Sequence, residues 1–262
     1  EAEAESYTRG IVEYSARVFN PFVRQGEYRS IDSPRLPRYA AVLPAISHTV
    51  ERMPSAYPRN DRKALLSFLR DTDYVHFCDT TCRDNTQSNS GNRFRLAEDL
   101  LIAPYLDNCG FFSLETGGGA HFHVNMMAKM TSPFFEAREI NRVAPKTLNQ
   151  ILIRTTNVLG YKPQPKNLMR VTAEKICEDS QVIRCFDFLN HIDNMRPFAA
   201  VALNTRGVVF QPAISPTYGR GFTVDHHLDV TLAILKQTAK ILAVGSKEAS
   251  REMILGLKDM AG

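Results

Sequence analysis

The 262-residue sequence predicts an α/β fold of the (β/α)8 TIM-barrel type, and three observations support this prediction. Short apolar runs alternate with amphipathic helical patterns, and continuously apolar strands are typical of parallel sheets that are buried on both faces. Successive runs begin roughly 26 to 45 residues apart, which is the spacing of βα units. Polar clusters follow the ends of several runs, where a barrel gathers its chemistry, whereas an open doubly wound sheet concentrates its binding loop after the first strand.

The apolar runs and the helical patterns place the elements of this fold along the chain. Strands are predicted at 74–78, 109–115, 149–154, 182–188, 208–214 and 253–258. Helices are predicted, among other places, at 97–106, 167–179 and 225–243, where apolar residues recur three or four positions apart. A closed barrel needs eight strands. The sequence is therefore expected to be truncated after the sixth βα unit, as a fragment or as one part of a split barrel.

The first 70 residues differ from the remainder and are predicted to form an irregular N-terminal arm. Six of the fourteen prolines lie within residues 1–60, where hydrophobic periodicity is weak. The arm is expected to end in a short helix near residues 61–70, and residues 71–262 are expected to form the barrel. Because the chain begins with Glu-Ala-Glu-Ala rather than Met, its start is expected to have been cut or engineered.

Composition excludes several functional classes. The net charge is only +4, and the arginines of residues 7–38 are interleaved with acids, which argues against nucleic-acid binding. No apolar stretch is long enough to span a membrane, and no signal peptide is visible. The five cysteines are odd in number and lie mostly in apolar runs. They indicate reduced thiols in a cytosol-like compartment.

The stretch "FCDTTCRDNTQS" (77–88) is the densest polar cluster that follows a predicted strand. Asp84, beside Arg83 and Gln87, is placed to bind a divalent metal or to orient a substrate. The structural alternative is a helix N-cap with a surface ion pair. Cys78 and Cys82 lack a second cysteine or histidine pair at zinc-site spacing, so we interpret them as structural.

The stretch "GGGAHFH" (117–123) suggests two kinds of site. The three glycines are not followed by the Gly-Lys-Ser/Thr or Rossmann spacing that a phosphate cradle requires. His121 and His123 have a common metal-ligand spacing, and on a strand they would share one face. The preceding glycines place them in a loop or at a helix start, so we do not predict metal binding by this pair.

Two basic residues stand at the ends of apolar strands. Arg154 ends "QILIR", and its guanidinium suits a carboxylate, with Tyr161 one short loop later. Lys258 ends "MILGL", where desolvation would lower its pKa and leave a neutral amine able to attack a carbonyl or to capture CO2 as a carbamate. The alternatives are structural ion pairs, to Glu115 or Asp187 for Arg154 and to Asp84 or Asp187 for Lys258.

Taken in order, "CDTTCRDNTQS", "FFSLETGGGAHF", "QILIRTTNVLGYKPQP", "VIRCFDFLNHIDNM", "PAISP" and "LGLKDMAG" resemble the carboxyltransferase domain of biotin-dependent enzymes. That group includes pyruvate carboxylase, the oxaloacetate decarboxylase α subunit and the transcarboxylase pyruvate-binding subunit. The resemblance runs from about residue 74 to the last residue. It implies a (β/α)8 barrel that transfers a carboxyl group between carboxybiotin and pyruvate or oxaloacetate through a metal-assisted enolate.

The resemblance also implies roles for individual residues. Asp84 matches a metal-binding aspartate, and Lys258 matches a lysine that becomes carbamylated and binds the metal. Arg83 and Gln87 match residues that line the pyruvate and biotin pocket. Arg154 and Tyr161 match residues at the carboxylate of the keto acid. The implied cofactors are a divalent metal (Zn, Mn or Co) and biotin carried on a partner domain or subunit.

The resemblance further implies assembly and location. The expected partners are biotin carboxyl carrier and biotin carboxylase domains or subunits, in a homo-oligomer or a hetero-complex. The expected compartment is the cytoplasm, or the mitochondrial matrix if the source is eukaryotic.

The sequence departs from the family pattern at several positions. Asn85 and Thr86 replace a usual Ala-His, and Gly117 replaces a usual tryptophan, which is expected to reshape the pocket. The family's His-x-His metal ligands lie on strand seven and its proton-shuttling threonine lies beyond the last strand, outside the regions found here. Two alternatives therefore remain: a lyase or aldol-type condensing barrel related to hydroxymethylglutaryl-CoA lyase, and a non-catalytic barrel subunit of a carboxylase complex.

Overall fold

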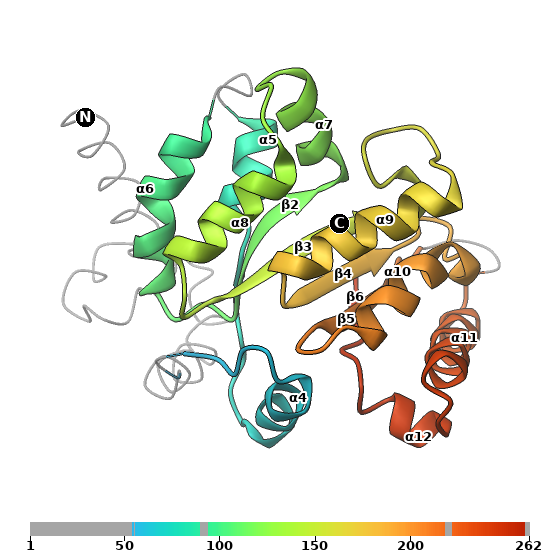
Figure 1. Ribbon diagram of the computed structural model, residues 1–262. Helices are drawn as coiled ribbons and strands as arrows, with labels where there is room; N and C mark the ends of the chain where they lie inside the picture. Colours follow the sequence, from blue (N-terminus) through green and yellow to red (C-terminus); the bar gives the residue numbers. More distant parts are fainter. Residues whose placement is uncertain (1–53, 55, 90–93, 218–221, 260–262) are drawn as a thin grey trace, which may run out of the picture.

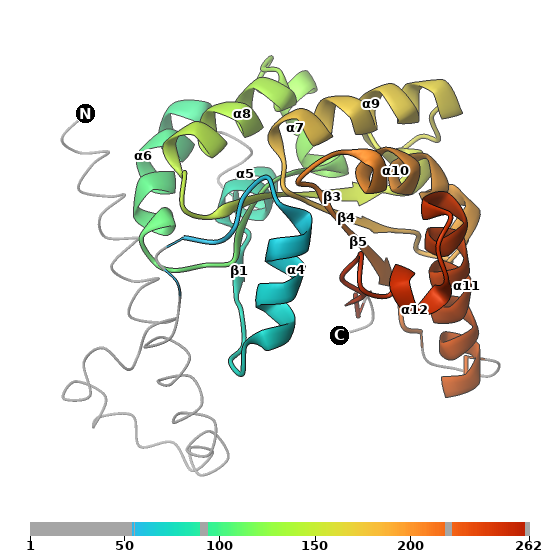
Figure 2. The same ribbon diagram turned by 60° about the horizontal axis from the view of Figure 1, so that its bottom comes forward.

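The computed structural model describes residues 54, 56–89, 94–217 and 222–259, so residues 1–53 of the predicted arm over 1–70 lie outside the described residues. The strands of the described part form a single parallel sheet in the order β1-β2-β3-β4-β5-β6. Each strand pairs with the next along the chain, and the helices between them lie along the sheet (Figures 1 and 2). This curled, open sheet of βα units confirms the predicted fold class.

Each of the six predicted strands overlaps an observed strand, but the prediction at 74–78 shares only Cys78 with β1, and the prediction at 109–115 begins four residues before β2. The observed strands are β1 Cys78–Asp79, β2 Ser113–Gly118, β3 Leu148–Arg154, β4 Val182–Phe186, β5 Val209–Ile214 and β6 Gly256–Leu257. The longer helices are α4 Arg62–Asp71, α6 Leu96–Asp107, α7 Gly119–Met127, α8 Pro133–Val143, α9 Lys166–Asp179, α10 Ile192–Asn204 and α11 Val224–Leu242. The short helical segments are η2 Thr81–Asn85, α5 Thr86–Ser88, η4 Thr155–Asn157 and α12 Ser246–Ala249.

The predicted helices α4, α6, α9 and α11 agree with the structure to within one residue at each end. Helices α7 and α10 have weaker sequence signals. Helix α7 begins among glycines, and α10 contains Pro197, both of which interrupt a helical pattern. Helix α8 begins with Pro133 at its first position after the N-cap Ser132.

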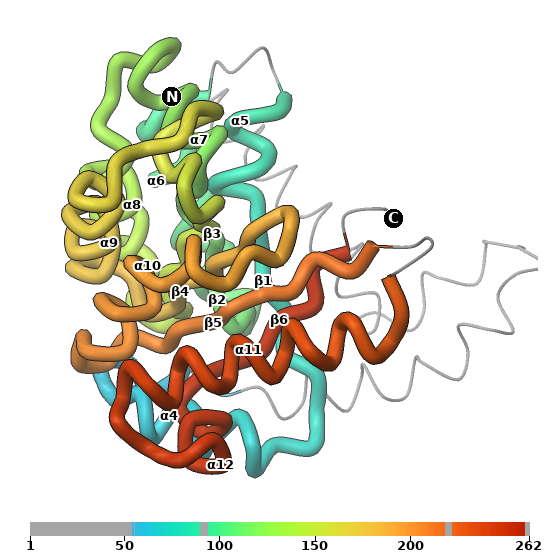
Figure 3. The backbone as a smooth tube through the Cα atoms, turned by 90° about the vertical axis from the view of Figure 1, so that its right-hand side faces the viewer, coloured from blue at the N-terminus to red at the C-terminus, as the bar shows by residue number. Residues whose placement is uncertain are grey.

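The strand alternation separates two sides of the sheet. In β3, Ile151 and Ile153 belong to the core packed against the outer helices, together with residues such as Phe198 of α10. The alternate residue Leu152 joins Phe186 and Ala213 in a small cluster on the other side. Figure 3 shows α8, α9 and α10 together along one side of the strands. The inner side of the sheet is therefore available for the site.

Helix α4 lies across the N-terminal ends of the strands. Its buried Leu65 and Leu66 pack with Leu148, Val182 and Val209, which are near the starts of three successive strands. This packing closes the end of the sheet opposite to the carboxyl ends of the strands. The predicted site residues lie at the opposite end, where the strands have their carboxyl ends.

The described helices do not combine the length and apolar character that a membrane crossing requires. All five cysteines lie in the described part of the chain, and each is a free thiol.

Candidate active site

A cavity of about 510 Å³ opens at the carboxyl ends of the strands. It brings together five of the six predicted site residues, which come from the ends of strands and from the η2–α5 segment. The lining residues are Arg83, Asp84, Gln87, Leu152, Arg154, Thr155, Thr156, Asn157, Phe186, Phe188 and Lys258. Its size suits a small organic substrate together with part of a second one.

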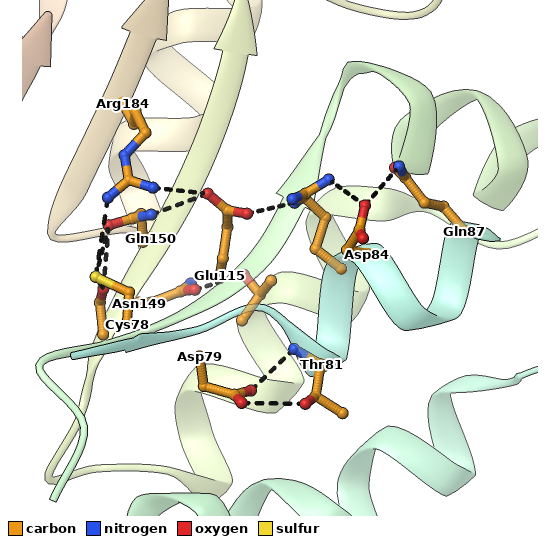
Figure 4. Close-up of polar contacts among 12 residues, drawn as sticks. Cys78, Asp79, Thr81, Asp84, Gln87, Glu115, Asn149, Gln150 and Arg184 are labelled. Carbon is orange, nitrogen blue, oxygen red and sulfur yellow. Dashed lines mark hydrogen bonds and ion pairs between the residues drawn. The ribbon is translucent and has the colours of Figure 1, made fainter. Parts of the chain in front are cut away.

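Arg83 is the centre of the ion-pair network at this site. Its Nε donates to the carboxylate of Glu115, which is 1% exposed, and its Nη1 donates to Asp84 Oδ1 at 3.1 Å. The amide of Gln87 donates to the same Asp84 oxygen at 3.0 Å. Figure 4 shows Asp84 and Gln87 on one side of this network and Glu115 on the other. The guanidinium is thus fixed by two carboxylates while it still lines the cavity.

The segment that carries these residues is anchored from behind. It begins as a π-helical turn, η2, and continues into α5, with Cys82 and Thr86 both buried beneath it. The Thr86 hydroxyl donates to Asp99 of α6 at 3.3 Å. Burial, followed by the nearby charge of Glu136, raises the pKa of Asp99 to about 8. Of the structural alternative for Asp84, the N-cap role is wrong, because Asp84 lies inside η2. The ion pair is present, because the half-exposed Asp84 carboxylate pairs with Arg83.

Arg154 presents a cation to the cavity. Its guanidinium lies 5.5 Å from the centre of the Tyr161 ring, and within the described part of the chain it forms no ion pair. The alternative partners are otherwise engaged: Glu115 pairs with Arg83 and Arg184, and Asp187 accepts from Thr155 and Asn194. The structural salt bridge for Arg154 is therefore not found among these residues.

Tyr161 lies beside Arg154 but does not line the cavity. Its side chain is 65% exposed, and its ring also contacts the His123 ring at 5.5 Å between centres. The structure thus brings Tyr161 to the arginine, as predicted, but places its ring at the rim.

Lys258 follows β6 and lines the same cavity. Its backbone N–H donates to Ile214 O at 2.9 Å, and its amine lies 5.0 Å from the centre of the Phe186 ring. Partial burial lowers the pKa of Lys258, and the cations of Arg83, Arg184 and Arg154 act in the same direction against the opposing charge of Glu115. No ion pair with Asp84 or Asp187 is present in the described structure. The lysine therefore has the environment that the sequence predicted for it.

A polar layer inside the sheet goes beyond the predicted site. Gln150 donates to Glu115 at 2.9 Å, and Arg184 lies 3.5 Å from Glu115 while its Nε donates to Gln211 at 2.7 Å. Figure 4 shows Gln150 and Arg184 gathered around Glu115. The signal in the sequence was a polar residue inside an otherwise apolar strand, in "VIRCF" and "VVFQPAI". Glu115, considered only as a partner of Arg154, is instead the anion shared by Arg83 and Arg184.

The two histidines of "GGGAHFH" are on α7 and do not act together. His121 is fully buried, and its Nε2 lies 2.9 Å from Glu136 Oε1. Desolvation lowers the pKa of His121, and the Glu136 carboxylate opposes this effect. His123 is exposed beside Tyr161. These positions agree with the helix start that the sequence suggested, and they give no support to a joint metal site.

Gly117 is not among the residues that line the cavity. A Cβ placed there would meet Phe122 Cε1 at 2.6 Å and Ile151 Cδ1 at 2.8 Å, both in the outer core. Residue 117 faces the packing between β3 and α7, so these contacts give no support to the expected change in the pocket. In this chain, the Phe122 ring occupies the space that a larger residue at position 117 would need.

Two residues for which a metal-binding role is expected, Asp84 and Lys258, line the same cavity. Asp84 is half exposed toward the cavity, and the lowered pKa of Lys258 fits an amine that reacts with CO2 to give an anionic oxygen ligand. Among the described residues, no group of three or more histidine, cysteine, aspartate or glutamate side chains is arranged to hold a metal. Asp84 and Lys258 therefore fit a divalent metal as two oxygen donors of a larger set.

Comparisons with known proteins agree with this geometry. No family model matches the sequence. The chain is 32% identical over 189 residues to a pyruvate carboxylase subunit from Methanothermobacter thermautotrophicus, covering 72% of this chain and 31% of that protein. It is 30% identical over 166 residues to the 2-oxoglutarate carboxylase large subunit from Hydrogenobacter thermophilus, covering 63% and 25%.

The solved structures include a similar fold. The carboxyl transferase domain from Rhizobium etli pyruvate carboxylase, with pyruvate and biocytin, has a TM-score of 0.65 and 26% identity, covering 77% of this chain and 33% of that chain. The chain thus spans about a third or less of the length of these proteins. The ordered motifs, the strand order and these similarities lead to one assignment: the chain belongs to the carboxyltransferase-domain family of the biotin-dependent carboxylases.

Proposed function

We propose that this site transfers a carboxyl group between carboxybiotin and pyruvate or oxaloacetate, through an enolate of the keto acid. The observation that carries the proposal is that one cavity collects Arg83, Asp84, Gln87, Arg154 and Lys258 from separate strand ends. Two of these side chains, Arg83 and Arg154, are guanidinium cations, which suits an anionic substrate. The relatives named pyruvate carboxylase support the same substrate class.

Arg154 binds the carboxylate of the keto acid in this proposal. Its guanidinium has no carboxylate partner among the described residues, so its paired donors are available to an anion. The fork shape fixes both the position and the plane of a carboxylate, and this orients the methyl carbon toward the other half of the cavity. Tyr161, beside the guanidinium, restricts its movement at the rim.

Arg83 and Gln87 stabilise the charge that develops on the keto oxygen when the methyl carbon loses its proton. Arg83 is held by Glu115 and Asp84, so its positive charge is in place before the reaction begins. Preorganised donors of this kind lower a barrier more than mobile ones, because they need no reorganisation. The enolate carbon then forms a bond to the transferred carboxyl carbon, whose bond to the carrier nitrogen breaks, and that nitrogen takes up the proton that the methyl carbon lost.

Asp84 and Lys258 would hold a divalent metal, Lys258 as its carbamate. Such a metal supplies Lewis-acid polarisation of a carbonyl oxygen. Biotin supplies the carboxyl group, carried by a partner domain or subunit together with a biotin carboxylase. The residues of this chain contribute binding, orientation and electrostatic stabilisation. A reducing compartment, the cytoplasm or the mitochondrial matrix, agrees with the five free thiols.

Oxaloacetate decarboxylation by the native enzyme at its natural length tests this function. We expect pyruvate release that requires biotin and is stimulated by a divalent metal. Cleavage of hydroxymethylglutaryl-CoA without biotin would instead support the lyase alternative. A barrel that neither binds pyruvate in calorimetry nor releases it from oxaloacetate would support the non-catalytic subunit.

A further inference from the structure

The three consecutive glycines 117–119 occupy the join between β2 and α7. They have no φ in the left-handed region, and Gly118 is extended, with φ 179° and ψ 172°. Because of these φ angles, the backbone would allow an alanine at each position. All three glycines are buried. The reason for glycine must lie in what a side chain would touch.

The two glycines nearest the cavity contact the stems of the two site arginines. A Cβ on Gly118 would lie 3.0 Å from Arg83 Cδ and 3.1 Å from the carbonyl oxygen of Leu152. A Cβ on Gly119 would lie 3.2 Å from the carbonyl oxygen of Asn157 and 3.4 Å from Arg154 Cδ. Separations between 3.0 and 3.4 Å are tighter than ordinary carbon contacts, so the neighbouring group must move.

We propose that Gly118 and Gly119 are positioning residues, which let the stems of Arg83 and Arg154 lie against the β2–α7 backbone and so set the two guanidinium groups across the cavity. The inference rests on the proposed carboxyl transfer. It assigns to the glycine tract a packing role toward two cations, in place of the phosphate binding that such a tract suggests.

The two positions differ in what would move. At Gly118 the Leu152 carbonyl belongs to the β3 strand, so the displaced group is the flexible stem of Arg83. At Gly119 the closest group is the backbone of η4, whose residues line the cavity beside Arg154. A methyl group at 118 therefore shifts the enolate-stabilising cation. A methyl group at 119 shifts the substrate-carboxylate pocket.

Alanine substitutions in the native enzyme at its natural length separate these effects. Gly118→Ala is expected to lower kcat about tenfold with KM for the 2-oxo acid nearly unchanged, since small displacements of a positioned group reduce the chemical step. Gly119→Ala is expected to raise that KM about five- to tenfold with kcat nearly unchanged. Pyruvate binding, measured by calorimetry without turnover, should weaken in Gly119→Ala alone.

Two further glycines serve as controls. In Gly117→Ala the added methyl group meets only side chains of the outer core. This variant should therefore have a lower melting temperature, without a selective change in either KM or kcat. Gly245→Ala, which has nothing within 4 Å of the added Cβ, should leave stability and kinetics unchanged.

The positioning role alone is overturned if the wild-type enzyme catalyses carboxyl transfer while Gly118→Ala and Gly119→Ala both have the kinetics of Gly245→Ala. Wild-type enzyme without carboxyl transfer or pyruvate binding would overturn the proposed function and this inference together. If Gly118→Ala does not fold, Gly119→Ala decides, because its closest contact is the looser of the two.

Discussion

Lys258 illustrates how position changes the chemistry of a single side chain. On a surface it would be an ordinary ammonium group, but here it is half buried beside Phe186, and burial together with nearby arginines lowers its pKa. A lysine amine that loses its proton more readily becomes a nucleophile. The same residue is therefore suited to carbamate formation and to metal binding.

Replacing Lys258 by alanine should reduce oxaloacetate decarboxylation by at least about a hundredfold, because the site loses the residue proposed to carry the carbamate. The measurement is the rate of pyruvate release by the intact enzyme. Lys247→Ala, at an exposed position on α12, is the matched control and should behave like wild type. Full activity in Lys258→Ala would exclude the carbamate role.

Replacing Arg154 by lysine tests the geometry of the guanidinium. Lysine keeps the charge but loses the paired donors, which are worth about 1.5–3 kcal/mol toward a charged acceptor, so KM for the 2-oxo acid should rise about tenfold to a hundredfold. Steady-state kinetics check this, with Arg170→Lys on the exposed face of α9 as control. An unchanged KM would mean that the carboxylate binds elsewhere.

At the scale of elements, the site depends on how four helical segments pack behind Asp84. Thr86 of α5 bonds Asp99 of α6, while α7 and α8 bring His121 and Glu136 together in the same buried region. Lys129, 3.1 Å from Glu136, adds a cation to it. This buried polar cluster fixes the segment that carries the site.

Asp99 makes stability depend on pH in a defined direction. Its pKa is raised in the folded protein from 3.8 to about 8. Its contribution to the free energy of unfolding is therefore fully present below pH 3.8 and is lost as the pH rises toward 8. In Asp99→Asn this loss should disappear, which would change the pH dependence of the unfolding free energy by an amount on the order of a few kcal/mol. Urea denaturation between pH 4 and about 8 measures it.

Asp229→Asn is the matched control, because Asp229 is exposed on α11 and should leave the pH profile unaltered. Parallel profiles for wild type and Asp99→Asn would contradict the assignment of the buried neutral carboxyl.

At the scale of the whole molecule, the described sheet has two edges. Strand β1 pairs only with β2, and β6 pairs only with β5, within the residues that the structure describes. Apolar side chains lie near both edges, with Val75 at 64% and Leu257 at 75% exposure. Unpaired edges with exposed apolar groups favour association with further strands.

The 262-residue polypeptide on its own should therefore self-associate. Leu257→Lys should shift sedimentation-velocity profiles toward monomer, because a charge on an edge strand opposes pairing. Leu168→Lys, on α9 and away from both edges, is the control. A wild-type polypeptide that sediments as a monomer at all concentrations would contradict this expectation.

The sequence by itself determined the βα order, the approximate strand positions and the placement of five of the six predicted site residues at strand ends around one cavity. Apolar runs such as "QILIR" mark strands because burial on both faces leaves a local pattern, and Arg154 and Lys258 stand out because each ends such a run. The ordered motifs then indicated the family. These are properties of neighbouring residues, and a sequence records them directly.

Only the tertiary structure decided which partners meet. Glu115 joins Arg83 and Arg184, although the three residues lie on different segments, and Gly117 faces the core while Gly118 and Gly119 face the arginines. The direction of a side chain at the end of a strand depends on local register, and β2 shifts register between Glu115 and Gly117. Pairings across strands arise from the curling of the sheet, so no local pattern specifies them.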